Sequence, residues 1–157
     1  MKTNLQKPKW GVKTEWVPIE QLPTTPSGIK EIAIDLETKD PRLKSHGPGW
    51  PTGNGDVVGI AVAYEGFNAY LPFAHEGGGN LDRGIVLRWF QKEIANHPSD
   101  KIFYNAAYDV GWLKRLDVDL KGRWIDVMLG APLLNENRFS FSLNTVAYDY
   151  LGEMKSE

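Results

Sequence analysis

The sequence contains no cysteine among its 157 residues. Disulfide scaffolds, cysteine-ligated zinc sites and thiol nucleophiles are therefore excluded. Histidine is also scarce: only His46, His75 and His97 occur, and no pair of them has the spacing of metal ligands. The composition consequently gives no support to a zinc finger, a cysteine hydrolase or a small secreted disulfide domain.

Long hydrophobic segments are absent as well. The longest apolar run, from Val57 to Tyr64, covers about eight residues and is too short to cross a bilayer. The first residues, MKTNLQKPKW, lack the hydrophobic region and the cleavage site of a secretory signal. We therefore expect a soluble, cytoplasmic protein with no membrane partner.

The sequence also lacks a large net charge of either sign. Its 18 basic and 20 acidic residues give a formal net charge of −2. This balance argues against a protein that coats duplex DNA non-specifically, because such binding depends on many phosphate contacts. It does not exclude an enzyme that grips a few nucleotides through metal ions. The hydrophobic content of 41% and the length fit a single globular domain.

What is present is a series of short β-branched segments and segments with helical periodicity. Residues 1–28 contain several prolines and are interpreted as an N-terminal arm, with a short strand near Trp16–Ile19, and residues 29–157 as the domain. The expected order is β-β-β-α-β-α-β-α, which indicates a mixed sheet with helices on its faces. The expected strands are Ile32–Glu37, Asp56–Tyr64, Phe67–Leu71, Lys101–Tyr104 and Trp124–Ile125, and the expected helices are Leu81–Asn96, Ala106–Leu116, Asp126–Leu134 and Leu143–Leu151.

Two acidic residues interrupt the first expected strand. Asp35 and Glu37 are two positions apart, so their side chains point to one face of the strand and the apolar neighbours point to the other. Burying two like charges side by side is costly, and a hard divalent cation with oxygen ligands relieves that cost. A strand end at which both acids reach solvent is the alternative that the spacing leaves open.

A third acid, Asp109, stands in the first turns of the helix that follows the fourth strand. The order of elements places this strand beside the first one, so the start of its helix should face the same sheet edge as Asp35 and Glu37. An acid near a helix start is also favoured by the helix dipole. Asp109 therefore indicates a functional site only together with the other two acids.

The three acids stand within motifs that resemble a known family. Asp35-x-Glu37-Thr38, followed by Asn105-x-x-Tyr108-Asp109, resembles motifs I and II of the DEDD exonuclease superfamily. The nearest match is the 3′–5′ proofreading domain of family-A DNA polymerases, those of phages especially. Supporting segments in family order are Val57–Ala61, Tyr70–His75, Trp124–Leu129 and Ser142–Gly152.

The resemblance implies an α/β fold of the RNase H-like type, with a mixed five-stranded sheet flanked by helices. It also implies a 3′–5′ exonuclease that removes 3′-terminal nucleotides from single-stranded DNA with two Mg2+ or Mn2+ ions. The catalytic residues and metal ligands that it implies are Asp35, Glu37 and Asp109. The substrate contacts that it implies are Thr38, Asn105 and Tyr108, with Leu36 as a wedge near the terminal base.

One part of the family pattern is missing. Motif III, Tyr-x-x-x-Asp or His-x-x-x-x-Asp, supplies a fourth acid from a later helix, but no tyrosine here is followed by an acid four residues later and no histidine by an acid five residues later. We therefore expect a domain that lacks the C-terminal helix of the family. Asp149 is the one late acid in a helical context, and we expect it to be an exposed helix residue. A split phage DNA polymerase, in which another polypeptide supplies the helix in the host cytoplasm, would account for this pattern.

Two other functions are left open by the sequence. A missing ligand is compatible with a catalytically weak or inactive nucleic-acid-binding module of the same fold. The motifs do not separate DNA from RNA either, so a 3′–5′ exoribonuclease is the remaining enzyme class.

Overall fold

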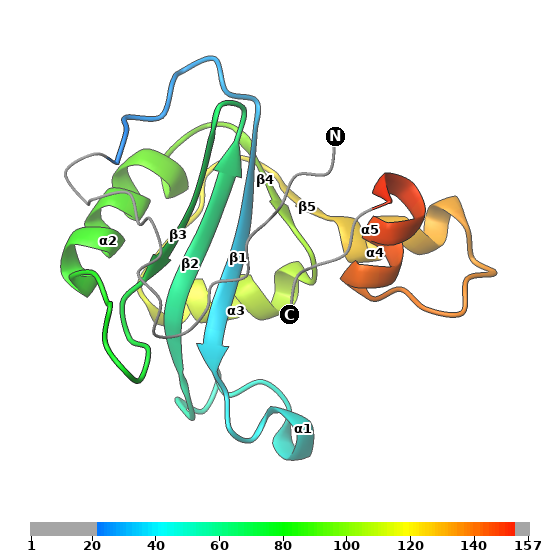
Figure 1. The fold of residues 1–157 in the computed structure, drawn as a ribbon, viewed down its shortest axis with the longest axis horizontal. Helices are drawn as coiled ribbons and strands as arrows, with labels where there is room; N and C mark the ends of the chain where they lie inside the picture. The colour runs from blue at the N-terminus through cyan, green and yellow to red at the C-terminus, as the bar shows by residue number, and fades with distance from the viewer. Residues whose placement is uncertain (1–21, 153–157) are drawn as a thin grey trace.

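Residues 22–152 are described by a computed structural model of the chain (Figure 1). The strand expected near Trp16–Ile19 lies outside these residues. The elements are β1 (Glu31–Lys39), α1 (Leu43–His46), β2 (Asp56–Tyr64), β3 (Phe67–Pro72), α2 (Arg83–Trp89), the π-helix η2 (Phe90–Ala95), β4 (Asp100–Phe103), α3 (Ala106–Arg115), β5 (Trp124–Asp126), α4 (Val127–Leu134) and α5 (Leu143–Leu151).

The five strands form one mixed sheet in the order β3-β2-β1-β4-β5. β2 is antiparallel to β1 and to β3, whereas β4 is parallel to β1 and to β5. The expected mixed sheet and the position of β4 beside β1 are confirmed, and β2 and β3 form a hairpin. The start of α3, which follows β4, is thereby brought to the carboxyl end of β1.

The core lies between one face of this sheet and the helices α2, η2 and α3. Ile32, Ile34 and Leu36 of β1 are at most 6% exposed and belong to the same cluster as Phe90 and Trp112 from the helices. Each such side chain contributes about 2 kcal/mol by leaving water. Because side chains alternate along a strand, this burial fixes Asp35 and Glu37 on the opposite face.

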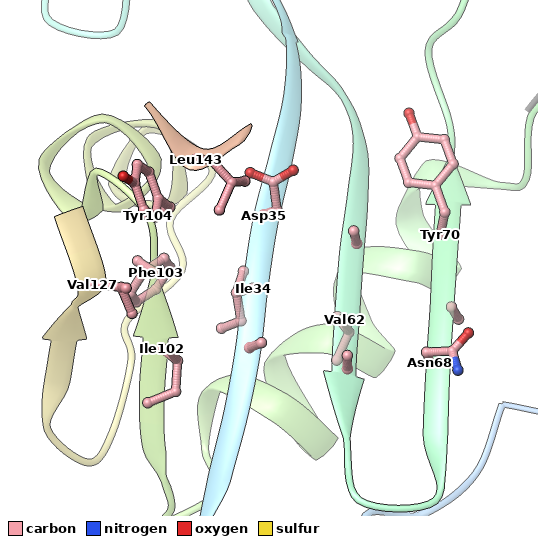
Figure 2. Close-up of a pocket in the computed structure, with 14 residues that line it drawn as sticks. Ile34, Asp35, Val62, Asn68, Tyr70, Ile102, Phe103, Tyr104, Val127 and Leu143 are labelled. Carbon is pink, nitrogen blue, oxygen red and sulfur yellow. The ribbon is translucent and has the colours of Figure 1, made fainter. Parts of the chain in front are cut away.

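That opposite face is the floor of an open groove of about 470 Å³ (Figure 2). Small side chains line its middle, among them Ala33, Ala61 and Ala63, while Val127 and Leu143 from the starts of α4 and α5 line its β4 side. Asp35 and Tyr70 lie toward one end of the groove, as Figure 2 shows. We call this feature the sheet groove.

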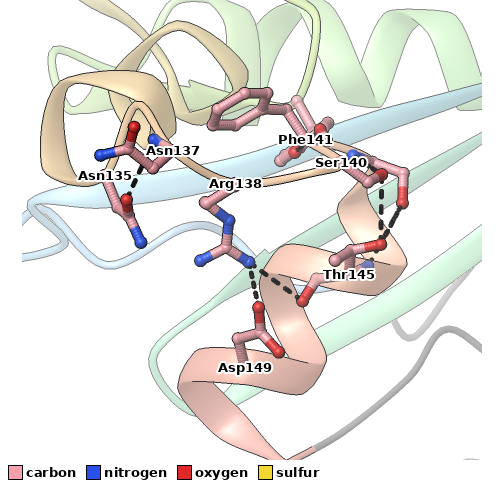
Figure 3. Close-up of polar contacts among 9 residues, drawn as sticks. Asn135, Asn137, Arg138, Ser140, Phe141, Thr145 and Asp149 are labelled. Atoms are coloured by element: carbon pink, nitrogen blue, oxygen red, sulfur yellow. Dashed lines mark hydrogen bonds and ion pairs between the residues drawn. The ribbon is translucent and has the colours of Figure 1, made fainter.

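Helices α4 and α5 project beyond the β5 edge of the sheet (Figure 1). Arg138, in the loop between them, donates to the Thr145 backbone oxygen at 3.4 Å and pairs with Asp149 of α5 (Figure 3). The two helices and the loop between them leave large apolar side chains in solvent, and we call these the α4–α5 apolar surface: Leu129, Leu133, Leu134, Phe139, Tyr148, Tyr150 and Leu151.

Two local features differ from the sequence-based expectation. The helix expected over Leu81–Asn96 changes to π geometry at Phe90, where Asn96 N–H bonds to Gln91 O five residues back. This wider turn buries Glu93 together with its apolar neighbours, and its carboxylate accepts the Thr25 N–H at 2.9 Å. The short helix α1 lies where the sequence indicated a loop.

None of the helices within residues 22–152 is long and apolar enough to cross a membrane.

Candidate active site

The central strand β1 presents two carboxylates on the face away from the core. Asp35 is half-buried and stands opposite Ala61 of β2, and Glu37 is exposed and stands opposite Gly59. The expectation that they share one face is confirmed. Both partners on β2 are small, so the space beside each carboxylate is not filled by a neighbouring side chain of that strand.

Asp109 joins these carboxylates from the first turn of α3, and its side chain is only 3% exposed. Burial, and after it the negative charge of Asp35, raises the pKa of the Asp109 carboxyl from 3.8 to about 7. Asp126 and Glu37 raise this pKa further, and a hydrogen bond from the backbone of Leu36 opposes the rise. Ionisation of Asp109 is therefore disfavoured both by its burial and by the charge of Asp35.

The start of α3 is held by a carboxylate from the end of β5. Asp126 accepts the N–H groups of Asn105 at 2.9 Å and Ala106 at 2.8 Å, and also caps α4 through Met128 N at 3.0 Å. Asn105 has φ 74°, in the left-handed region that asparagine tolerates better than most residues. Asp126 thus caps α4 and at the same time holds the start of α3.

Thr38 and Tyr108, both expected to touch substrate, are joined to each other. The Tyr108 hydroxyl donates to Asp40 Oδ2 at 3.1 Å and therefore accepts from the Thr38 hydroxyl, at 2.7 Å. Asp40 also accepts Gly49 N–H, which ties the loop after β1 to α3. Tyr108 and Asn105 line a second pocket, of about 420 Å³, together with apolar side chains of that loop: Leu43, Pro48 and Trp50.

Two of the remaining sequence-based assignments have a clear outcome. Leu36 was expected to be a wedge against a base, and this is wrong for its side chain, which is 6% exposed within the core on the other face of β1. Its contribution to the site is the backbone N–H that binds Asp109. Asp149 is exposed on α5 and paired with Arg138, as expected of a helix residue without a ligand role.

The donor set suits a hard divalent cation, because Asp35, Glu37 and Asp109 offer carboxylate oxygens, and the charges of Asp35 and Glu37 disfavour the ionisation of Asp109, a cost that a bound cation relieves. Within residues 22–152, however, no three acidic or histidine side chains converge closely enough to enclose a metal ion. The three carboxylates thus form an electrostatically coupled but open group.

Tyr70 and His75 are residues of this region to which sequence reasoning assigned no role. The Tyr70 hydroxyl is hydrogen-bonded to His75 Nε2, and the negative charges of Glu37 and Asp35 contribute to a raised pKa of Tyr70. Burial is the largest cause of that rise. The signal that leads to this pair is the hairpin register, which places Tyr70 opposite Ala61 and hence in the row of Asp35.

Comparisons with known proteins agree with this geometry. A family model described as 3′–5′ exonuclease, of the DNA polymerase A type, matches residues 19–157. The chain is 36% identical over 142 residues to a DNA-directed DNA polymerase of Pseudomonas phage M6, a match that covers 87% of this chain and 21% of that protein. The chain thus spans about a fifth of the length of that relative.

Solved structures share the fold. Brucella melitensis NrnC with bound Mg2+ superimposes with a TM-score of 0.57 at 14% identity, over 83% of this chain and 58% of that one. Trypanosoma brucei RNase D gives a TM-score of 0.58 at 18% identity, over 83% and 43%. The fold is therefore the RNase H-like fold of these nucleases, as expected. By the family match and the phage relative, the chain belongs to the 3′–5′ exonuclease domains of DNA polymerase A.

Proposed function

We propose that this chain removes nucleotides one at a time from the 3′ end of single-stranded DNA, as the proofreading part of a phage DNA polymerase. One observation carries the proposal: Asp35, Glu37 and Asp109 are electrostatically coupled at one edge of the sheet. The 36% identity to a phage DNA polymerase favours DNA over RNA.

The chain's own groups have distinct parts in this reaction. Asp35, Glu37 and Asp109 would hold two Mg2+ or Mn2+ ions, which when bound activate water for attack and stabilise charge on the phosphate. The Leu36 N–H keeps the Asp109 carboxylate directed toward this edge. Because Asp109 has a pKa of about 7, it is only partly ionised near neutral pH until positive charge is present.

The terminal nucleotide would occupy the 420 Å³ pocket that Asn105 and Tyr108 share with Trp50. This pocket combines aromatic and amide groups, which suit stacking on a base and hydrogen bonding to its edge. The basic side chains of Arg42 and Lys44 stand on the adjacent exposed helix α1, where a phosphate backbone would be attracted. A single-stranded 3′ end needs only a few such contacts, so the net charge of −2 is sufficient.

We further propose that a helix from the polymerase polypeptide lies in the sheet groove and supplies the fourth acid. The groove is apolar and ends at Asp35, and its alanine floor leaves room for a closely packed helix. In the neighbouring α4–α5 apolar surface, Leu129 is 66% exposed and Leu133 is 88% exposed. A cluster of exposed apolar side chains of this kind is uncommon on a monomeric protein and is typical of a protein interface. Together the two surfaces fit one amphipathic partner.

The direct experiment follows the 3′ end. 5′-labelled single-stranded DNA and RNA of the same sequence are incubated in Mg2+ with the full chain, with and without a downstream polymerase polypeptide. The proposal predicts a ladder that shortens from the 3′ end on DNA, faster with the polypeptide, and no ladder with Asp35→Ala. A ladder on RNA but not on DNA would indicate a 3′–5′ exoribonuclease instead. A ladder unaffected by Asp35→Ala would refute the assignment of the active site.

A second candidate function is a nucleic-acid-binding module without catalysis. It is favoured by the open arrangement of the carboxylates, which do not enclose a metal ion within residues 22–152. This candidate predicts retention of labelled single-stranded DNA in a gel-shift assay and no shortening under any of the conditions above.

A further inference from the structure

Tyr70 forms a row with Asp35 across three strands. Tyr70 of β3 stands opposite Ala61 of β2, which stands opposite Asp35 of β1, so the three side chains share one face. His75 follows β3, and its ring meets the Tyr70 ring edge-on with 5.8 Å between centroids. The Tyr70 hydroxyl and His75 Nε2 are hydrogen-bonded.

The phenol of Tyr70 lies across Gly59, the residue that stands opposite Glu37. A Cβ at Gly59 would overlap the Tyr70 hydroxyl, so only glycine admits the phenol here. Since paired Cβ positions lie about 5 Å apart on the same face, the hydroxyl is within the length of the Glu37 side chain. Burial has the largest influence on both rings, since it raises the pKa of Tyr70 and lowers that of His75. The negative charge of Glu37 adds to the rise for Tyr70 and partly opposes the fall for His75.

The backbone of His75 is held by two further hydrogen bonds, both with Asn80. Asn80 accepts the His75 N–H at 2.8 Å and donates to the His75 carbonyl oxygen at 2.8 Å. These bonds close the loop that contains Gly77, Gly78 and Gly79, all of which have positive φ. Asn80 thus fixes the backbone of His75 at the start of this glycine loop, where the imidazole contacts Tyr70.

The hydrogen-bond directions follow from the charges. If Tyr70 donated to His75, the lone pairs of its oxygen would face the carboxylates and be repelled by them. If His75 donates from Nε2 instead, the phenolic proton is available to a carboxylate. The second arrangement satisfies all three groups.

We propose that Tyr70 and His75 are positioning residues for Glu37: His75 Nε2–H donates to Tyr70, and Tyr70 donates to the Glu37 carboxylate and holds it in place for a divalent cation. This inference rests on the proposed function, because it assumes that Glu37 binds a cation. Groups that orient metal ligands in this way typically change metal affinity 10- to 100-fold when they are removed.

The test uses the full chain and Mn2+ alone, with bound Mn2+ measured by the loss of the free-ion signal in electron paramagnetic resonance. Tyr70→Phe and His75→Ala are expected to weaken Mn2+ binding about 10-fold or more, whereas His75→Gln, which keeps an N–H donor, restores most of the affinity. Tyr64→Phe is the matched control, because Tyr64 lies on the other face of β2 and stacks on Phe67. Circular dichroism melting confirms that each variant is folded.

A second readout needs no metal. Nitrogen-15 shifts of the His75 ring are expected to report the tautomer protonated at Nε2. Protonation at Nδ1 alone, or equal Mn2+ affinity of Tyr70→Phe and the wild type, overturns the positioning role and leaves the proposed function standing. If the wild type is folded but binds no Mn2+, the cation site is refuted, and the proposed function and the positioning role of Tyr70 and His75 are refuted with it.

Discussion

Replacing Asp109 by asparagine is expected to stabilise the metal-free protein, although it removes a candidate ligand. The wild-type carboxyl is 3% exposed and repelled by Asp35, and its pKa rises from 3.8 to about 7. Asparagine has the same shape and no charge, and its side-chain oxygen still accepts the Leu36 N–H. The substitution therefore removes the repulsion and the desolvation cost while it keeps the hydrogen bond.

The magnitude follows from the two pKa values. A carboxyl whose pKa is higher in the folded state favours folding at low pH, and this advantage is lost as the pH rises from about 4 through 7. A rise of about three pKa units corresponds to about 4 kcal/mol at pH 8, and to about 2 kcal/mol at pH 5. In a chain of this size the larger value corresponds to a rise in melting temperature of about 10 °C for Asp109→Asn.

The assay is thermal and urea unfolding in EDTA at pH 5 and pH 8. Asp117→Asn is the matched control, because Asp117 is an exposed aspartate just beyond the end of the same helix. Added Mg2+ is expected to stabilise the wild type and not Asp109→Asn. Equal stability of Asp109→Asn and the wild type at pH 8, or a difference that shrinks as the pH rises, would refute the electrostatic coupling of these carboxylates.

Three further predictions concern the support of the site. Lys101 is fully buried, and its ammonium donates to three backbone oxygens: His97 O at 2.7 Å, Ser99 O at 2.8 Å and Lys121 O at 2.9 Å. Lys101→Met should therefore lower the free energy of unfolding, measured in urea, by about 2–4 kcal/mol. Lys121→Met, at an exposed position, should leave it unchanged. Asp126→Ala should cost about 1–2 kcal/mol and speed amide hydrogen exchange at Asn105, Ala106 and Met128, so unchanged exchange there would contradict the shared cap. Ala63→Phe, which fills the sheet groove, should abolish stimulation by the polymerase polypeptide, whereas Glu65→Ala, in the adjacent turn, should leave it intact.

The sheet was predictable because the pattern of apolar residues along each strand indicates which face of that strand is buried. Burial on one face produces the alternation of Ile32, Ile34 and Leu36, and that alternation also places Asp35 and Glu37 on the other face. The Asp82 and Asp126 caps were predictable for a similar reason, since a cap is a contact between residues two or three positions apart.

The parts that escaped prediction depend on distant neighbours. The wedge role of Leu36 came from the family resemblance, whereas its alternation with Ile32 and Ile34 already places it on the core face, where the structure buries it. The position of Asp109 near Asp35 was predicted from the order of elements, but its burial and its raised pKa depend on how α3 packs. The proximity of Tyr70 to the carboxylates follows from the register of β2 and β3, which pairs residues of separate strands and is not visible in the sequence. The same holds for His75, which contacts Tyr70.

Hydrolysis at the 3′ end by these carboxylates is measured as the release of a labelled 3′-terminal nucleotide. The chain, in Mg2+ and with the polymerase polypeptide, is compared with Asp35→Ala on the same single-stranded DNA. We expect release of the labelled mononucleotide by the wild type and a loss of about 100-fold or more in Asp35→Ala. Release at the same rate by both proteins would contradict this expectation.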